Sequence, residues 1–202
     1  MRALFGGSFD PVHRGHVALV DHLLETDLVD VIHVVPAAQS PHKSIAQATA
    51  HHRLAMVRLA FAEHPEVEIE LREIQSGERC YTIETMRSLM KDFPGDSWSL
   101  VIGADHVHHF DSWHRFEELL ELAHLIVMNR PGCQLDAERW SKIDLKRKVT
   151  FVEDFAMTVS ASALREQIAA GDLSWHQLVS AGLPENVARY TIEKELYRSL
   201  EA

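Results

Sequence analysis

The stretch "GGSFDPVHRGH", residues 6–16, joins a short apolar run to an amphipathic segment and decides how the chain folds. The apolar run at residues 2–5 predicts a buried strand, because short apolar runs ended by glycine are typical of parallel sheets. Apolar residues recur with helical spacing over residues 16–28, and a β-branched run at 31–35 ends at Pro36. The order strand, turn, helix, strand therefore predicts a parallel α/β unit.

The same alternation continues through most of the chain. Further strands are predicted at 67–71, 99–102, 125–128 and 149–152, and helices at 53–64, 82–91 and 116–122. Strands separated by helices imply right-handed crossovers, which predicts a Rossmann-like, doubly wound parallel sheet with helices on both faces. After Val152 only helices are expected, at 160–170, 175–180 and 184–200. We expect one domain over 1–202, with an α/β core at 1–155 and a small helical closure at 156–202.

Composition and charge restrict the partners of the protein. The net charge is -10, from 30 acidic against 20 basic residues, so the chain lacks the broad basic surface that non-specific nucleic-acid binding requires. The two cysteines, Cys80 and Cys133, are too few for a disulfide framework or a four-cysteine zinc site. No apolar run approaches the roughly 20 residues of a membrane span, and no signal peptide is evident. These features predict a cytoplasmic protein with neither membrane nor nucleic-acid partners.

The turn after the first strand has the chemistry of a phosphate site. Ligands of open parallel sheets bind beyond the carboxyl ends of the strands, where this turn lies. Gly6 and Gly7 let backbone N–H groups approach a phosphate, and the following helix directs its positive end there. His13 and His16, three residues apart, would face one direction and donate to phosphate oxygens. The alternative is an ordinary turn capped by Asp10, with incidental histidines.

The whole string resembles the G-x-F-D-P-x-H-x-G-H signature of the nucleotidyltransferase superfamily, and within it the bacterial nicotinate mononucleotide adenylyltransferases. The resemblance covers nearly the full chain. Ser40, Glu84, Ala161 and Ser162 replace a proline, an aspartate, a serine and a threonine of the family pattern. Four further segments carry the resemblance: Ser40-Pro41-His42-Lys43 (P-P-H-K), Tyr81-Thr82-Ile83-Glu84-Thr85 (Y-T-I-D-T), Ile102-Gly103-Ala104-Asp105 with Trp113 (I-G-A-D and a tryptophan), and Val159-Ser160-Ala161-Ser162-Ala163-Leu164-Arg165 (I-S-S-T-x-I-R).

The resemblance implies a reaction and a set of site residues. The phosphate of nicotinate mononucleotide would attack the α-phosphorus of ATP in line, giving deamido-NAD and pyrophosphate. The second pKa of a phosphate is about 6, so the attacking oxygen is already anionic and needs no general base. Mg²⁺ is expected to bind together with ATP, held mostly by the phosphates and water, and no side chain is assigned as its ligand. The implied catalytic residues are His13, His16, Lys43 and Arg165. The implied ATP-binding residues are Gly6, Gly7, Ser8, Phe9, His13, His16, Ile102, Gly103, Asp105, Ser160, Ser162 and Arg165. Those implied for nicotinate mononucleotide are His42, Lys43, Tyr81, Thr82, Asp105 and Trp113.

Several alternatives stay open at this point. The histidine-rich segment 105–114 has the residue types of a transition-metal site. Trp113 could be a core aromatic, Arg165 an exposed helix cation and Asp105 a helix cap. The chain could be another adenylyltransferase of the superfamily, with nicotinamide mononucleotide or phosphopantetheine as acceptor, or a non-catalytic nucleotide-binding protein. The sequence is compatible with a homo-oligomer but does not determine the oligomeric state.

Overall fold

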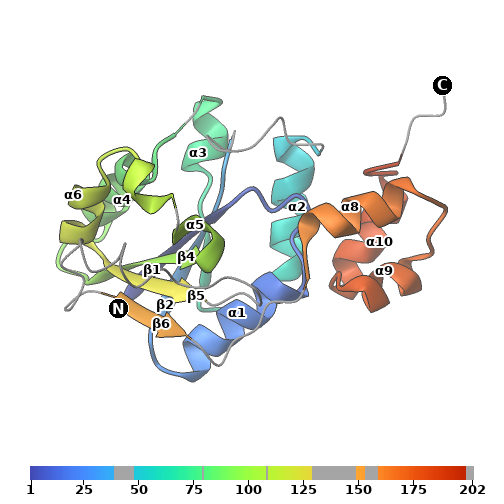
Figure 1. Ribbon diagram of the computed structural model, residues 1–202. Coiled ribbons are helices and arrows are strands. Elements are labelled where there is room, and N and C mark those ends of the chain that lie inside the picture. The colour runs from blue at the N-terminus through green and yellow to red at the C-terminus, as the bar shows by residue number, and fades with distance from the viewer. Residues whose placement is uncertain (39–47, 79, 108, 129–148, 153–158, 199–202) are drawn as a thin grey trace.

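A single parallel sheet forms the centre of the protein. The computed structural model describes residues 1–38, 48–78, 80–107, 109–128, 149–152 and 159–198 (Figure 1). Six strands pair in the order β3-β2-β1-β4-β5-β6, and all neighbouring strands are parallel. The predicted Rossmann-like α/β fold is therefore confirmed. The strands are β1 (Arg2–Gly7), β2 (Val31–Pro36), β3 (Val67–Ile69), β4 (Trp98–Gly103), β5 (His124–Met128) and β6 (Val149–Val152).

Helices cover both faces of the sheet, as Figure 1 shows. Buried residues of α1, α2 and α8–α10 form a first core on one face, and those of α4–α6 form a second core on the other. The described helices are α1 (Arg14–Glu25), α2 (Ala50–Ala60), α3 (Arg72–Ser76), α4 (Thr82–Asp92), α5 (Ala104–Val107), α6 (Phe116–Leu122), α8 (Ala161–Ala169), α9 (Trp175–Ala181) and α10 (Glu185–Glu193), with a 3₁₀ turn η1 at Phe110–Ser112.

Alternation along the central strands divides the two cores. Ala3 and Phe5 of β1 belong to the first core, whereas Leu4 between them belongs to the second. In β4, Val101 faces the first core and Leu100 the second. Successive side chains of a strand point to opposite faces, so these continuous apolar runs bury both sides of the sheet.

The C-terminal helices pack beside the first turn of the chain. The backbone N–H of Arg14, at the start of α1, donates to the carbonyl of Gly182 at 2.8 Å. Gly182 has φ +120, and a Cβ there would lie 2.8 Å from a methyl carbon of Val159. Glycine is therefore required where α9 ends and the chain passes α1 and α8. Within the described residues, every helix falls short of the length and apolar character needed to cross a bilayer.

Helix boundaries differ from the prediction at a few places. The short helix α3 was not predicted, since its five residues carry no clear apolar period. The last predicted helix, 184–200, ends at Glu193 in α10, and Pro184 is its N-cap residue. Beyond this end, Glu195 and Tyr197 adopt positive φ angles of 49° and 65°, which a continuing helix does not allow.

Candidate active site

The predicted site residues gather where the strand order of the sheet reverses. β1 pairs with β2 on one side and with β4 on the other, so the crossovers leave in opposite directions at this point. Such a switch point leaves a crevice beyond the carboxyl ends of the strands. β1 ends at Gly7 and β4 at Gly103, and the turn before α1 starts there. The predicted pair Ile102 and Gly103 closes β4, with Ile102 buried and Gly103 partly exposed.

The β1–α1 turn is shaped by the side chain of Phe9. Phe9 is 1% exposed and has a φ of 47°, a left-handed conformation that is uncommon outside glycine. A Cβ on Gly7 would approach the Phe9 ring to 3.1 Å, so this glycine makes room for the ring. A Cβ on Gly6 would meet only a Leu4 methyl at 3.6 Å, an ordinary contact. The two glycines, grouped together in the sequence prediction, therefore differ: a side chain at Gly7 would crowd the Phe9 ring, whereas a Cβ at Gly6 would make only an ordinary contact.

His13 and His16 form a stacked pair at the start of α1. Their ring centroids lie 3.7 Å apart with an interplanar angle of 25°. The backbone N–H of His13 donates to Nδ1 of His16 at 3.1 Å, so that nitrogen carries no proton. An imidazole that accepts at Nδ1 carries its N–H at Nε2. His13 is 1% exposed and His16 is half-buried, with its ring at the edge of Phe9. The prediction that both imidazoles lie on one face is confirmed.

Arg165 reaches the same turn from α8. Its Nη1 donates to the carbonyl of Asp10 at 2.6 Å and its Nη2 to Oγ of Ser162 at 3.3 Å. Ser160 is the N-cap residue of α8, as the motif predicted, and both serines are exposed. The reading of Arg165 as a merely exposed cation is excluded by its half-buried position and its bond to the turn.

The N-terminus of α4 and the segment after α5 carry the described residues predicted for the acceptor, and they lie side by side. Thr82 opens α4, as predicted, and Tyr81 before it offers no side-chain cap to the helix. The Tyr81 ring packs on His114 with centroids 4.5 Å apart, which joins α4 to the Trp113 segment. Trp113 is half-buried against the second core, with its ring 5.2 Å from that of Phe110. Trp113 therefore packs partly into the core, in agreement with the alternative that it is a core aromatic.

Three predicted site residues cannot be placed by their side chains. His42 and Lys43 lie outside the described residues. Asp105 belongs to α5, directly after β4, but its side chain is not described.

Among the described residues, the group able to hold a metal is His33, Glu68 and Glu70. The carboxylates of this cluster are already paired with arginines, Glu68 with Arg2 and Glu70 with Arg72. Nδ1 of His33 lies 2.9 Å from Oε1 of Glu70, and Nη1 of Arg2 lies 3.0 Å from Nε2 of the same ring. Arg72 pairs with Glu70 at 2.7 Å, and the His33 and Arg72 bonds lower the pKa of the Glu70 carboxyl. Since both ring nitrogens of His33 are occupied by protein groups, we interpret the cluster as a structural charge network. Within the segment 105–114 the Asp105 side chain and His108 lie outside the described part of the chain, so the metal alternative there stays a prediction.

A residue missed by the sequence analysis lies beneath the turn. Arg53 of α2 is 1% exposed, and its guanidinium donates to the carbonyls of Ser8 at 2.7 Å and Ala38 at 3.1 Å. The available signal was an arginine within the apolar side of a helix, three and four residues before the buried Met56 and Val57. Arginine is almost never fully buried without a specific partner.

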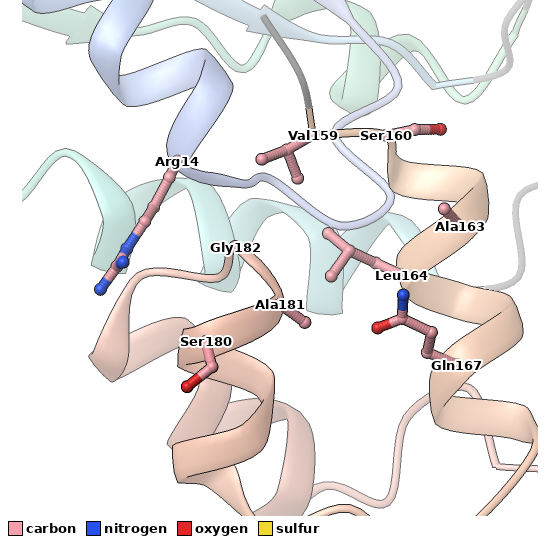
Figure 2. Close-up of a pocket in the computed structure, with 9 residues that line it drawn as sticks. All are labelled: Arg14, Val159, Ser160, Ala163, Leu164, Gln167, Ser180, Ala181 and Gly182. Carbon is pink, nitrogen blue, oxygen red and sulfur yellow. The ribbon is translucent and has the colours of Figure 1, made fainter.

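Figure 2 shows an open hollow of about 390 Å³ between the first residue of α1 and the helices α8 and α9. Neither His13 nor His16 lines it. Ser160 and Arg14 do, but Figure 2 draws the Arg14 side chain leading away from Ser160. The hollow therefore does not bring the two histidines together with Ser160.

Comparison with known proteins connects this arrangement to one group of enzymes. Residues 4–167 match the family model described as cytidylyltransferase-like. The chain is 36% identical over 199 residues to the probable nicotinate-nucleotide adenylyltransferase of Gloeobacter violaceus, covering 96% of this chain and 94% of that one. It is 32% identical over 212 residues to the protein of the same name from Acidithiobacillus ferrooxidans, covering 97% and 95%.

Solved structures share the fold. The nicotinic acid mononucleotide adenylyltransferase of Plasmodium falciparum complexed with NaAD superimposes with a TM-score of 0.78 at 20% identity, covering 97% of this chain and 96% of that one. The same enzyme complexed with APC gives a TM-score of 0.76, also at 20% identity and with the same coverage.

Proposed function

Because the chain belongs to the cytidylyltransferase-like family, we propose that it is a nicotinate-nucleotide adenylyltransferase of NAD biosynthesis. The enzyme transfers the adenylyl group of ATP to nicotinate mononucleotide, giving deamido-NAD and pyrophosphate. The observation that carries the proposal is the stacked His13–His16 pair at the start of α1, beside the switch point of the sheet. An imidazole N–H and a helix N-terminus at one point favour a bound phosphate.

The chemistry requires alignment more than proton transfer. An anionic oxygen of the mononucleotide phosphate forms a bond to the α-phosphorus of ATP, while the bond to the β-phosphate oxygen breaks and pyrophosphate leaves. The enzyme must hold the reactants in line and stabilise charge on the moving phosphoryl group. His16 supplies a neutral N–H donor, since its Nδ1 already accepts from His13. We assign Arg165, with its permanent charge at the start of α8, to the leaving pyrophosphate.

The remaining ATP contacts are proposed from the turn and from the ends of β4 and α8. Gly6, Gly7, Ser8 and Phe9 would contribute backbone N–H groups, and Lys43 and His42 would lie between the two substrates. The other residues proposed to bind ATP are Ile102, Gly103, Asp105, Ser160 and Ser162.

The acceptor would bind at the start of α4. The backbone N–H groups of Glu84 and Thr85 donate to the Tyr81 carbonyl, whereas those of Thr82 and Ile83 donate to no described acceptor. Two open N–H groups at a helix N-terminus favour an anion, which is the physical basis for preferring a nicotinate carboxylate over an amide. Trp113 and Tyr81 offer aromatic surface to the pyridine ring, and Asp105 would accept ribose hydroxyls.

Enzymes of this kind use a divalent metal with ATP, and we propose Mg²⁺. The described part of the turn does not fit direct metal coordination. Its buried carboxylate, Asp10, already accepts from the Tyr197 hydroxyl at 2.8 Å and from the Ala48 N–H at 3.1 Å. The ion would therefore be held by the phosphates and water, where it would neutralise phosphate charge. We further propose one domain over residues 1–202, a cytoplasmic location, and no nucleic-acid partner.

The test is an acceptor comparison with the purified protein. ATP is supplied with nicotinate mononucleotide, nicotinamide mononucleotide or phosphopantetheine, and pyrophosphate and the dinucleotide are measured by chromatography. We expect deamido-NAD and pyrophosphate in equal amounts, with the acid as the best acceptor. Equal or faster turnover with either rival would contradict the substrate assignment. ATP binding without turnover on any acceptor would indicate a nucleotide-binding protein.

A further inference from the structure

Arg53 is a buried cation bound to backbone carbonyls, an unusual choice of partners. Its guanidinium donates to two main-chain oxygens, those of Ser8 and Ala38. Ser8 lies in the β1–α1 turn and Ala38 follows β2, so one guanidinium joins two segments at the carboxyl edge of the sheet. Burial lowers the pKa of Arg53, and the nearby charge of Asp10 acts in the opposite direction. Arginine nevertheless stays protonated in proteins, so both bonds are charge-assisted.

The bond to Ser8 fixes the direction of one peptide unit. In a trans peptide the carbonyl and the following N–H point in opposite directions. With the Ser8 carbonyl turned to Arg53, the Phe9 N–H points away from α2. Phe9 is 1% exposed, and its N–H donates to no acceptor among the described residues. A buried N–H without an acceptor costs free energy, so an acceptor supplied by a ligand would stabilise this turn.

The surrounding bonds hold the turn in this state. Phe9 has a left-handed φ, which costs roughly 1 kcal/mol or more for a residue with a Cβ. The carbonyl of Asp10 is held by Arg165, and its carboxylate by Tyr197 and the Ala48 N–H. The residue before Phe9, Ser8, is thus held by Arg53, and the residue after it, Asp10, is held by three further donors.

We propose that Arg53 is a positioning residue that turns the Ser8–Phe9 peptide so that the Phe9 N–H donates to a phosphate of bound ATP. The inference rests on the proposed function for the identity of the ligand, but it concerns nucleotide binding and does not require the acceptor. Arg53 itself touches no substrate. It acts through the peptide that it orients.

The first experiment reads the Phe9 amide directly in the wild-type protein. Phe9 is the only phenylalanine preceded by serine, so a sample with ¹³C-carbonyl serine and ¹⁵N-phenylalanine gives a single selected ¹⁵N–¹H signal. ATP, and separately sodium tripolyphosphate, are titrated without any acceptor. We expect a saturable downfield proton shift of this signal with both probes. Saturated ATP binding that leaves the signal unmoved would overturn the proposal.

The second experiment tests the part played by Arg53. Lysine at position 53 keeps the charge but cannot span both carbonyls with a planar fork. For Arg53→Lys we expect kcat to fall about 10- to 100-fold through misplaced phosphates, with the KM for nicotinate mononucleotide unchanged. The amide shift on ATP binding should also shrink. Arg58→Ala, at an exposed position of the same helix, is the matched control and should leave both readouts unchanged.

A variant of a buried residue can fail to fold, so Arg53→Met, which retains the apolar stem without charge, is prepared in parallel. Wild-type kcat and an unchanged amide shift in a folded Arg53 variant would overturn the positioning role. A wild-type protein that shows the amide shift but makes no deamido-NAD would refute the proposed function and leave the role of Arg53 intact.

Discussion

His16 has two separable tasks, and one pair of substitutions distinguishes them. Its Nδ1 accepts the backbone N–H of His13 and so caps α1, while the opposite ring nitrogen, Nε2, is the proposed donor to a phosphate. His16→Ala removes both groups. His16→Gln retains an acceptor, because glutamine at this third helical position is a usual partner in a capping box, but it removes the imidazole.

The expected magnitudes follow from the contacts. Loss of the cap costs about 1 kcal/mol of unfolding free energy. Loss of the edge contact with the Phe9 ring, at 5.1 Å between centroids, costs about 0.5 to 1.5 kcal/mol. His16→Ala loses both terms and His16→Gln only the second, so the two variants should differ by about 1 kcal/mol. Both lose the imidazole N–H proposed to donate to phosphate, so turnover should fall about 10²- to 10³-fold in each.

Urea denaturation measures the stability difference, and initial rates of pyrophosphate release at saturating ATP measure turnover. The reasoning is refuted if His16→Gln keeps near wild-type kcat while His16→Ala loses it, because the imidazole would then serve only to cap the helix. Equal unfolding free energies for the two variants would refute the capping role.

Three further outcomes are expected. Gly7→Ala should destabilise the protein by about 1 to 3 kcal/mol, because the added methyl group meets the Phe9 ring, whereas Gly6→Ala should be near neutral; thermal unfolding compares them. Burial raises the pKa of Glu73 above its ordinary value of 4.5, so folding disfavours the ionised form and wild type carries a penalty that develops as pH rises above that value. Glu73→Gln should therefore be more stable than wild type at pH 8, with an advantage that fades as pH approaches 4.5; an advantage independent of pH would contradict this. Tyr197→Phe should lose about 1 to 3 kcal/mol in urea denaturation, because a buried carboxylate loses its hydroxyl donor; an unchanged midpoint would show that water replaces the donor.

The architecture was predictable because its signals are local. Most strands contain a short apolar run, and some end at a recognisable stop residue, such as Gly7 at the end of β1 and Pro36 at the end of β2. Because parallel strands need crossover connections, the alternation of strand-like and helix-like apolar patterns left few possible topologies. The placement of His13 and His16 on one side was also predicted correctly, since they are three positions apart and both stand at a helix start.

Interactions between distant parts of the chain were not predictable. Nothing near Arg53 shows that a carbonyl 45 positions earlier accepts its hydrogen bond. Helical spacing extended the last helix to residue 200, but the chain leaves the helix after Glu193 and brings Tyr197 to Asp10. A tertiary contact overrides local propensity there, as it does for the left-handed Phe9.

The bond between Tyr197 and Asp10 also sets an order of events during synthesis on the ribosome. The two residues are 187 positions apart, and the guanidinium of Arg165 comes 155 positions after Asp10. At a synthesis rate of about 5 to 20 residues per second, Tyr197 leaves the ribosome roughly 10 to 40 s after the turn does. During this interval Ala48 and Arg53 are the first of the described partners of the turn to leave the ribosome. A nascent chain stalled before residue 165 should therefore form the bonds of Arg53 to the Ser8 carbonyl and of Ala48 to the Asp10 carboxylate, but lack those of Arg165 and Tyr197 to Asp10.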